Sequence, residues 1–140
     1  MTCSCKEKKA IQTDKAPKAL GPYSVAIQLG NLVFASGQLG LDPSTGNLVE
    51  GGIEGETRQS LTNLKHVLEA AGSGMDRVIK TTVFLRDMAD FPRMNAVFGE
   101  FFSENPPARS TVQVTLPRGG AVEIDAIGFT LDDCCCDCKD

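Results

Sequence analysis

Six strand-like segments and only two helical segments follow one another along this chain of 140 residues. The strand-like segments lie at 9–13, 23–29, 32–36, 77–85, 110–115 and 121–131. Two helices can cover only one face of a sheet of this size, so the order β-β-β-α-β-α-β-β predicts an α+β fold with both helices on one face. Strand residues such as Ile27, Val33 and Val112 make a wholly wet opposite face unfavourable. We therefore expect another subunit to cover it.

Apolar residues at intervals of three and four define both helices. The first helix ends before Gly72, a residue suited to a helix C-terminus. The second follows Asp90, a suitable N-cap, and stops at Asn105-Pro106. The residues expected on the buried face of the first helix are Ile53, Thr57, Leu61, Leu64, Leu68 and Ala71. Those on the buried face of the second helix are Phe91, Met94, Phe98 and Phe101.

One turn and one longer loop are also predicted. Gly30-Asn31 lies between the second and third strands and is typical of a two-residue hairpin. The stretch 37–52 is rich in turn residues, with Asp42-Pro43-Ser44-Thr45-Gly46 at its centre, and is predicted to be a loop.

Composition predicts one folded domain at 9–131, between a cysteine-bearing tail at 1–8 and a cysteine-rich acidic tail at 132–140. The hydrophobic content of 41% and charged content of 23% are typical of soluble globular proteins. No apolar run approaches the roughly 18 residues of a membrane span. The first ten residues also lack the apolar stretch of a secretory signal, so we expect a cytoplasmic protein.

The charge distribution argues against nucleic acid as the main partner. The net charge is -4, and the only basic cluster, Lys6, Lys8 and Lys9, lies at or next to the N-terminal tail. Binding to a phosphate backbone depends on a surface of basic residues. One tyrosine and no tryptophan leave little aromatic surface for stacking with bases.

All six cysteines lie near the two ends of the chain, at 3, 5, 134, 135, 136 and 138. A disulfide scaffold would distribute them through the fold, so that interpretation fails. Thiolates are preferred ligands of soft metals such as zinc and Cu(I), but the usual C-x-x-C spacing is missing. Two possibilities remain open: the tails form a soft-metal site, or they have no such role.

The central domain lacks several familiar catalytic elements. It has no cysteine, and its only histidine, His66, is predicted on the solvated face of the first helix. No G-x-x-x-x-G-K-[ST] or G-x-G-x-x-G motif is present. Acid-base and binding chemistry without an evident cofactor remains.

One arginine and one glutamate stand out in NPPARSTVQVTLPRGGAVEIDA, at 105–126. Arg109 opens a strand, and a guanidinium there suits a planar carboxylate ligand. Glu123 lies among apolar residues in the next strand, where it could hold or activate water. The alternative is an ordinary ion pair between the two at a sheet edge.

Several ordered motifs resemble the Rid/YjgF family of reactive-intermediate deaminases, and within it the RidA subgroup. They cover nearly the whole chain from about residue 10 to 130. The motifs are AP-x-A-x-GPYS at 16–24, FASGQLGLDPSTG at 34–46, R-Q-S-L-x-N at 58–63, KTTVFL-x-D-M-x-D-F at 80–91, Asn95 followed by EFF at 100–102, PARS at 107–110 and VEIDAI at 122–127.

The resemblance implies a chorismate-mutase-like homotrimer whose sheets form a central barrel, with active sites in the clefts between subunits. It also implies hydrolysis of reactive 2-imino acids and their enamines, such as 2-iminobutanoate and 2-iminopropanoate, to 2-keto acids and ammonia. No cofactor is implied. Non-catalytic binding of a small carboxylate, a chaperone role and ribonuclease activity are alternatives attached to the same family.

The resemblance also implies roles for individual residues. Arg109 would hold the substrate carboxylate, and Glu123 would activate water; Asp125, two residues on, shares its strand face and is a weaker candidate. Backbone can approach a ligand closely at Gly37. The implied substrate-binding residues are Tyr23, Ser36, Gly37, Asn95, Arg109 and Thr111.

The chain departs from the family pattern at three places. The segment from Arg109 to Glu123 is one residue shorter than usual, and we expect the gap in the turn LPRGG, because a deletion inside a strand would reverse its faces. Thr111 replaces a cysteine or alanine common in relatives. The cysteine tails lie outside the pattern altogether.

Overall fold

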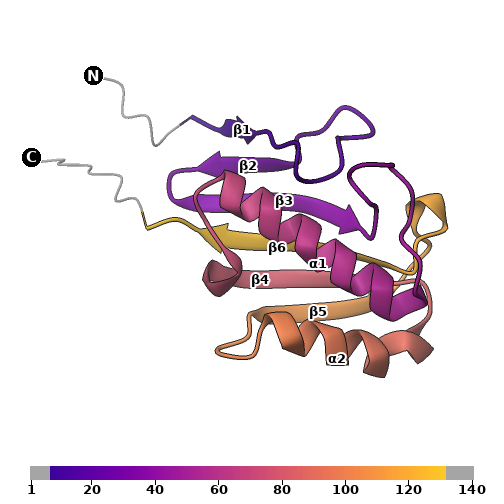
Figure 1. Cartoon of the computed structure of the whole chain (residues 1–140). Coiled ribbons are helices and arrows are strands. Elements are labelled where there is room, and N and C mark those ends of the chain that lie inside the picture. Colours follow the sequence, from indigo (N-terminus) through magenta and orange to yellow (C-terminus); the bar gives the residue numbers. More distant parts are fainter. Residues whose placement is uncertain (1–6, 132–140) are drawn as a thin grey trace, which may run out of the picture.

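A computed structural model describes residues 7–131, and within them a six-stranded sheet carries two α-helices. The sheet order is β1-β2-β3-β6-β4-β5 (Figure 1). Short 3-10 turns lie at η2 (Met75–Arg77), η3 (Met88–Asp90) and η4 (Pro117–Gly119). The strands and helices are β1 (Lys9–Ile11), β2 (Ala26–Leu29), β3 (Leu32–Leu39), α1 (Gly52–Ala70), β4 (Val78–Leu85), α2 (Phe91–Phe101), β5 (Ala108–Gln113) and β6 (Val122–Phe129).

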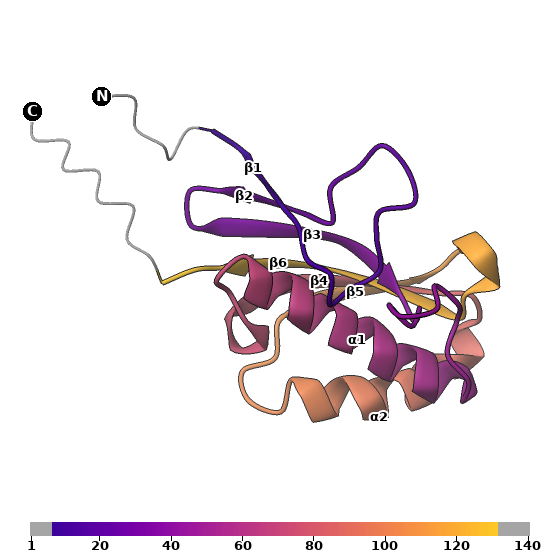
Figure 2. The same cartoon turned by 45° about the horizontal axis from the view of Figure 1, so that its top comes forward.

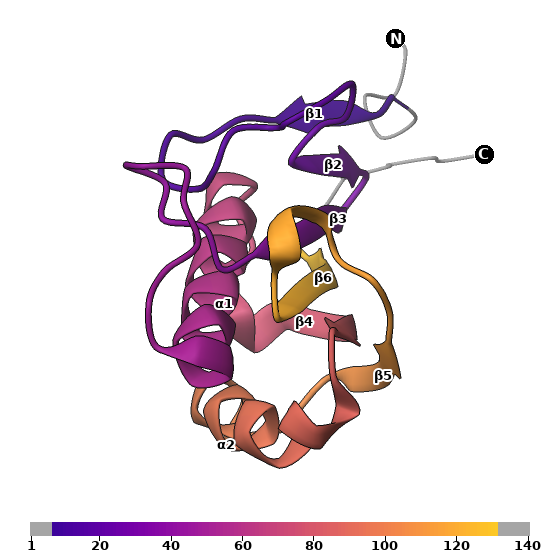
Figure 3. The same cartoon turned by 90° about the vertical axis from the view of Figure 1, so that its right-hand side faces the viewer.

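Both helices pack on the same face of the sheet, which confirms the predicted α+β architecture. They lie side by side beneath the strands in Figure 2, and the view along the sheet in Figure 3 has both on one side of it. Burial of apolar side chains between helices and sheet is the main source of stability in such a layered fold. The core includes Val33, Val83 and Ile124 from strands, Leu61, Leu64 and Leu68 from α1, and Met94 and Phe98 from α2.

The opposite face of the sheet has no helix among the described residues. It carries exposed apolar side chains, namely Leu29, Leu32, Phe34 and Val112. Val33, which we expected to contribute to this face, is instead fully buried beneath the helices. Its neighbours Leu32 and Phe34 point to the open side because side chains alternate along a strand.

The helix ends follow the predicted signals only in part. Gly72 adopts a left-handed φ of 81°, and the N–H groups of Gly72 and Ser73 donate to the carbonyls of Glu69 and Leu68, which is a Schellman motif. Asp90 occupies the N-cap position of α2, but its side chain caps no helix N–H. Its carboxylate accepts a hydrogen bond from Arg93 instead.

Strand boundaries differ from the predictions where long-range pairing decides them. The second strand begins at Ala26 instead of residue 23, so Tyr23 lies in the preceding loop. The third continues to Leu39, through glycine-containing sequence that we had predicted as loop, because it pairs with β6. The Gly30-Asn31 hairpin is confirmed by the pairing of Leu29 with Leu32.

β4 and β5 are parallel neighbours joined through α2, and β6 lies between β3 and β4. From Val122 to Ile127, β6 pairs with β4 without interruption. The alternation of its faces is therefore regular through Glu123 and Asp125. Within residues 7–131, no helix is long and apolar enough to cross a membrane.

Candidate active site

A bulge in β3 opens the sheet beside Glu123. Ala35 pairs with Ala126 of β6, but the next pairs are Gln38 with Ile124 and Leu39 with Glu123. Three steps along β3 therefore face two along β6, and Ser36 and Gly37 occupy the irregular stretch. Bulges of this kind bend a strand and re-aim its side chains, and they are common next to active sites.

Gly37 gives the Glu123 carboxylate its space. A Cβ atom at Gly37 would lie 2.4 Å from Oε1 of Glu123, much closer than any real contact. We had expected this glycine to allow close approach of a ligand to the backbone. In the structure it allows close approach of the proposed base.

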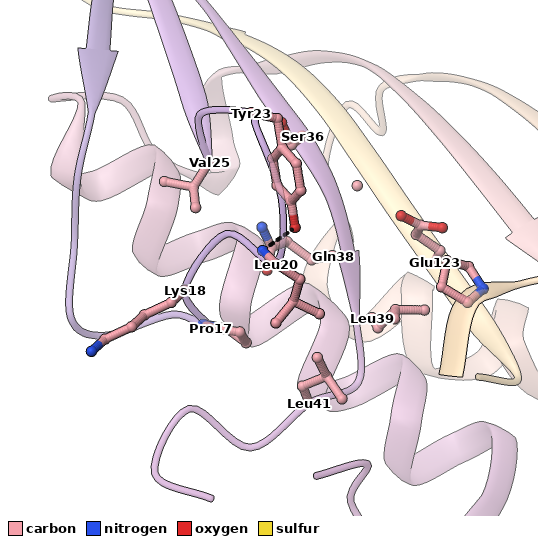
Figure 4. A pocket seen from close by; sticks show the side chains of 12 residues that line it. Pro17, Lys18, Leu20, Tyr23, Val25, Ser36, Gln38, Leu39, Leu41 and Glu123 are labelled. Atoms are coloured by element: carbon pink, nitrogen blue, oxygen red, sulfur yellow. Dashed lines mark hydrogen bonds between the residues drawn. The ribbon is translucent and has the colours of Figure 1, made fainter. Parts of the chain in front are cut away.

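Glu123 lies at the wall of a cavity of about 380 Å³. Three other predicted site residues, Tyr23, Ser36 and Gly37, line the same cavity. Figure 4 shows the Glu123 carboxylate on one side, with Tyr23 and Leu20 on the other. The remaining lining, much of it apolar, is Pro17, Lys18, Leu20, Val25, Gln38, Leu39, Leu41 and Pro117.

The two hydroxyl groups of this cavity have different bonding states. The Tyr23 oxygen accepts a hydrogen bond of 3.0 Å from the Leu20 N–H, and the ring is half exposed. Its own proton therefore remains available to a ligand. Ser36 instead donates its proton to the Ser24 carbonyl at 2.7 Å, so its oxygen can serve a ligand only as an acceptor.

The environment of Glu123 makes its carboxyl a stronger base than usual. Burial raises its pKa above the ordinary value, and the neighbouring carboxylate of Asp125 raises it further. Asp125 itself accepts a hydrogen bond of 2.8 Å from the backbone N–H of Thr82. Because this bond ties Asp125 to β4, Glu123 is the better-placed base of the two.

Arg109 and Asn95 line a different cavity, of about 420 Å³, between α2 and the start of β5. The guanidinium carbon of Arg109 lies 4.7 Å from the Phe98 ring centre and 5.4 Å from that of Phe91. Burial lowers the Arg109 pKa, yet an arginine remains charged at any physiological pH. Arg109 forms no ion pair among residues 7–131, so its guanidinium group can bind a planar anion.

Arg109 and Glu123 lie on opposite faces of the sheet. Arg109 is paired with Thr81, which is fully buried beneath the helices. Thr111, two residues on, shares the Arg109 face. Glu123 alternates with the buried Val122 and Ile124 and so points to the open side. The ion pair considered from the sequence is therefore not formed, and one chain does not bring the two residues together.

Other residues near the cavity gained no role from the sequence. Lys18 lines the Glu123 cavity from within AP-x-A-x-GPYS, and its variable position in that motif gave no signal. Ser60 and Asn63 belong to R-Q-S-L-x-N, a motif that contributes to the family resemblance but predicted no role for either residue. His66 contacts the Lys15 carbonyl through Nδ1 at 2.9 Å and lines neither cavity.

Metal ligands are not grouped in the described part of the chain. Residues 7–131 contain no cluster of three or more histidine, cysteine or carboxylate side chains that could hold an ion. The six cysteines all lie outside these residues, at 1–6 and 132–140.

Comparison with known proteins places this chain in a family. The family profile described as "Endoribonuclease L-PSP" matches residues 13–129, and these include both cavities' principal residues. The chain belongs to this family. This is the Rid/YjgF family that its motifs resemble, so the predicted recognition is confirmed.

Named relatives of this Rid-family chain cover nearly its whole described length. It is 50% identical over 121 residues to a mouse 2-iminobutanoate/2-iminopropanoate deaminase, covering 86% of this chain and 90% of the relative. The crystal structure of RidA from Psychrobacter is 48% identical, with a TM-score of 0.84 over 86% of this chain and 98% of the other. Escherichia coli TdcF with bound serine is 41% identical, with a TM-score of 0.83 over 86% and 98%.

The raised pKa of Glu123 predicts a pH-dependent effect of Glu123→Gln on stability. A carboxyl whose pKa is higher in the folded than in the unfolded chain stabilises the fold below its unfolded pKa, and that stability is lost as pH rises through the folded pKa. Glu123→Gln should therefore be more stable relative to wild type at pH 7.5 than at pH 4, as measured by denaturant unfolding at both pH values. Glu54→Gln, an exposed change on α1, is the control. If Glu123→Gln differed from wild type in unfolding free energy by the same amount at both pH values, the raised pKa of Glu123 would be contradicted.

Proposed function

We propose that this protein hydrolyses reactive 2-imino acids, such as 2-iminobutanoate and 2-iminopropanoate, to 2-keto acids and ammonia. The observation that carries the proposal is the presence of two chemical types: a partly buried guanidinium with no anionic partner among residues 7–131, and a carboxyl of raised pKa in an otherwise largely apolar cavity. The deaminase name of close relatives supports the same reaction. The serine named with TdcF is a small carboxylate, the ligand class that Arg109 suits.

We further propose that the complete site forms between copies of the chain. Arg109 of one copy and Glu123 of another can share a substrate although the two residues of one chain cannot. The exposed apolar side chains on the open sheet face favour burial against other subunits, and the resemblance implies a homotrimer. Each interface of a cyclic trimer joins two different surfaces, as such a shared site requires.

The proposed chemistry needs no group beyond these residues and water. Arg109 binds the substrate carboxylate through two parallel hydrogen bonds, which orients the adjacent imine carbon. Glu123 accepts a proton as the water oxygen bonds to that carbon, and this proton passes on to the imine nitrogen to give a carbinolamine. The C–N bond of the carbinolamine then breaks as its hydroxyl proton is transferred to the nitrogen, so that ammonia leaves and the 2-keto acid remains. Orientation supplies much of the acceleration, because imines also hydrolyse in water.

The ribonuclease activity in the family description is the less well supported reading for this chain. The net charge is -4, while RNA binding depends strongly on basic surface. The histidine that could assist phosphate chemistry contacts the Lys15 carbonyl outside both cavities. An arginine that binds a carboxylate and a glutamate that accepts a proton serve imine hydrolysis more directly.

Replacing Arg109 tests the function directly. In an assay where a threonine dehydratase generates 2-iminobutanoate, wild type should accelerate release of the keto acid, and Arg109→Ala should lower kcat/KM by roughly 100-fold, as expected for losing a bidentate charged contact of about 2–3 kcal/mol. Arg93→Ala removes an exposed arginine of α2 and should retain full activity. Full activity in Arg109→Ala would exclude the proposed clamp, and absence of acceleration by wild type would exclude the deaminase.

A second candidate function concerns the cysteines, which lie outside the described residues. Lys9 pairs with Gln28, Gln28 with Val33, and Val33 with Gly128, so the first residue of β1 and the next-to-last residue of β6 lie in one row of the sheet. Three strand spacings separate the ends of that row, about 14 Å. Cys5 and Cys134 are four and six residues beyond it, enough extended chain to span roughly 13 and 20 Å. We propose that thiolates from both tails bind one soft metal ion.

Metal content of the full-length protein tests this candidate. Reduced protein loaded with zinc and freed of excess metal should retain it. Replacing either set of cysteines with serine should lower zinc content or weaken its affinity at least tenfold. Equal retention by a variant that lacks all six cysteines would exclude the tails as ligands. The sets are Cys3 and Cys5, and Cys134, Cys135, Cys136 and Cys138.

A further inference from the structure

Of the four buried polar side chains of α1, three hydrogen-bond to residues outside the helix, and the hydroxyl of the fourth, Thr57, has no hydrogen-bond partner among the described residues. Glu56, Ser60 and Asn63, here called the α1 polar seam, follow one another at intervals of four and three, which places them on one helix face. Glu56 is 7% exposed, and the other two are fully buried. Burial of polar groups is costly unless each is hydrogen-bonded, so the identity of their partners reveals what they stabilise.

Two members of the α1 polar seam hold β3 where it passes Glu123. Ser60 donates to the Gln38 carbonyl at 2.6 Å. Asn63 donates to the carbonyls of Leu39 and Leu41, at 3.2 and 2.9 Å. Gln38 and Leu39 directly follow the bulge, and Leu39 is the cross-strand partner of Glu123. These bonds therefore hold Leu39 in place, and Leu39 is the β3 residue that pairs with Glu123.

The third member holds the entry to β6. Oε1 of Glu56 accepts a hydrogen bond of 2.9 Å from the Ala121 N–H, two residues before Glu123. The end of β3 also runs directly against the same turn of α1, since a Cβ atom at Gly40 would lie 2.7 Å from the Glu56 Cα. The start of β6, the strand that carries Glu123, and its neighbour β3 are thus tied to one helix.

We propose that the α1 polar seam positions Glu123 for proton transfer, acting through the backbones of β3 and β6. This inference rests on the proposed function of Glu123 as the base. Every hydrogen bond that the three side chains make to residues outside α1 ends on Gln38, Leu39, Leu41 or Ala121. Three of these residues line the Glu123 cavity, and the fourth leads into its strand. The R-Q-S-L-x-N motif, which contains Ser60 and Asn63, thereby gains a role as part of the support of the site.

A pair of substitutions at Glu56 separates positioning from packing. Glu56→Gln keeps a carbonyl oxygen for the Ala121 N–H and should retain kcat within about twofold. Glu56→Met keeps comparable bulk without the acceptor. It should lower kcat roughly tenfold, because a misplacement of about 1 Å can cost as much as 100-fold. KM should change little, since Arg109 holds the substrate carboxylate.

The pH dependence supplies a readout that lost packing alone would not move. Burial is the main cause of the raised Glu123 pKa, so a Glu123 that shifts toward water should titrate lower. In Glu56→Met, the acid limb of the kcat profile and the Glu123 titration seen by carbon NMR should both move to lower pH. Ser60→Ala is a milder variant that should move both in the same direction if Glu56→Met does not fold.

Leu64→Val is the matched control, because it destabilises the same buried face of α1 without removing a bond of the seam. It should lower thermal stability while kcat and the Glu123 titration stay at wild-type values. Wild-type kcat and titration in both Glu56→Met and Ser60→Ala, or an equal change in Leu64→Val, would overturn the positioning role. An inactive wild type would instead refute the proposed function, and the NMR titration would still test the seam.

Discussion

Packing of both helices on one face of a single sheet is the constraint on which the rest of the structure depends. It directs alternate side chains of β5 and β6 either into a helix-covered layer or onto an open apolar face. Arg109 consequently lies against the phenylalanines of α2, whereas Glu123 lies in a cavity on the other side. Because the fold separates Arg109 and Glu123 within one chain, the two residues could contact the same ligand only if they came from different copies of the chain.

The same arrangement explains the environment of each of the two residues. Arg109 is partly desolvated beside aromatic rings and has no anionic partner among the described residues, so its guanidinium can bind a carboxylate. Glu123 has a raised pKa because the bulge and Gly37 leave it in a partly dry recess near a second carboxylate. Such a carboxyl is less stable when ionised and a better proton acceptor, a common compromise between stability and activity.

Local patterns predicted much of this architecture. The stripes of α1 and α2 could be found because helix periodicity depends on neighbouring residues alone, and Gly72 ended α1 as expected. The bulge at Ser36 and Gly37 could not, because it arises from pairing with a strand about 90 residues later in the chain. The faces of Arg109 and Glu123 depend on sheet order for the same reason. The motifs singled out Arg109 and Glu123, but they could not show that the two residues lie on opposite faces of the sheet.

Mixing two impaired variants tests the shared site most directly. Arg109→Ala and Glu123→Gln should each be strongly impaired alone in the coupled imine assay. Refolding or co-expressing them in equal amounts should restore about one quarter of wild-type activity, because each site would draw its arginine and its glutamate from different copies at random. Mixed assemblies that form and remain as inactive as the separate variants would contradict a site built from Arg109 of one copy and Glu123 of another.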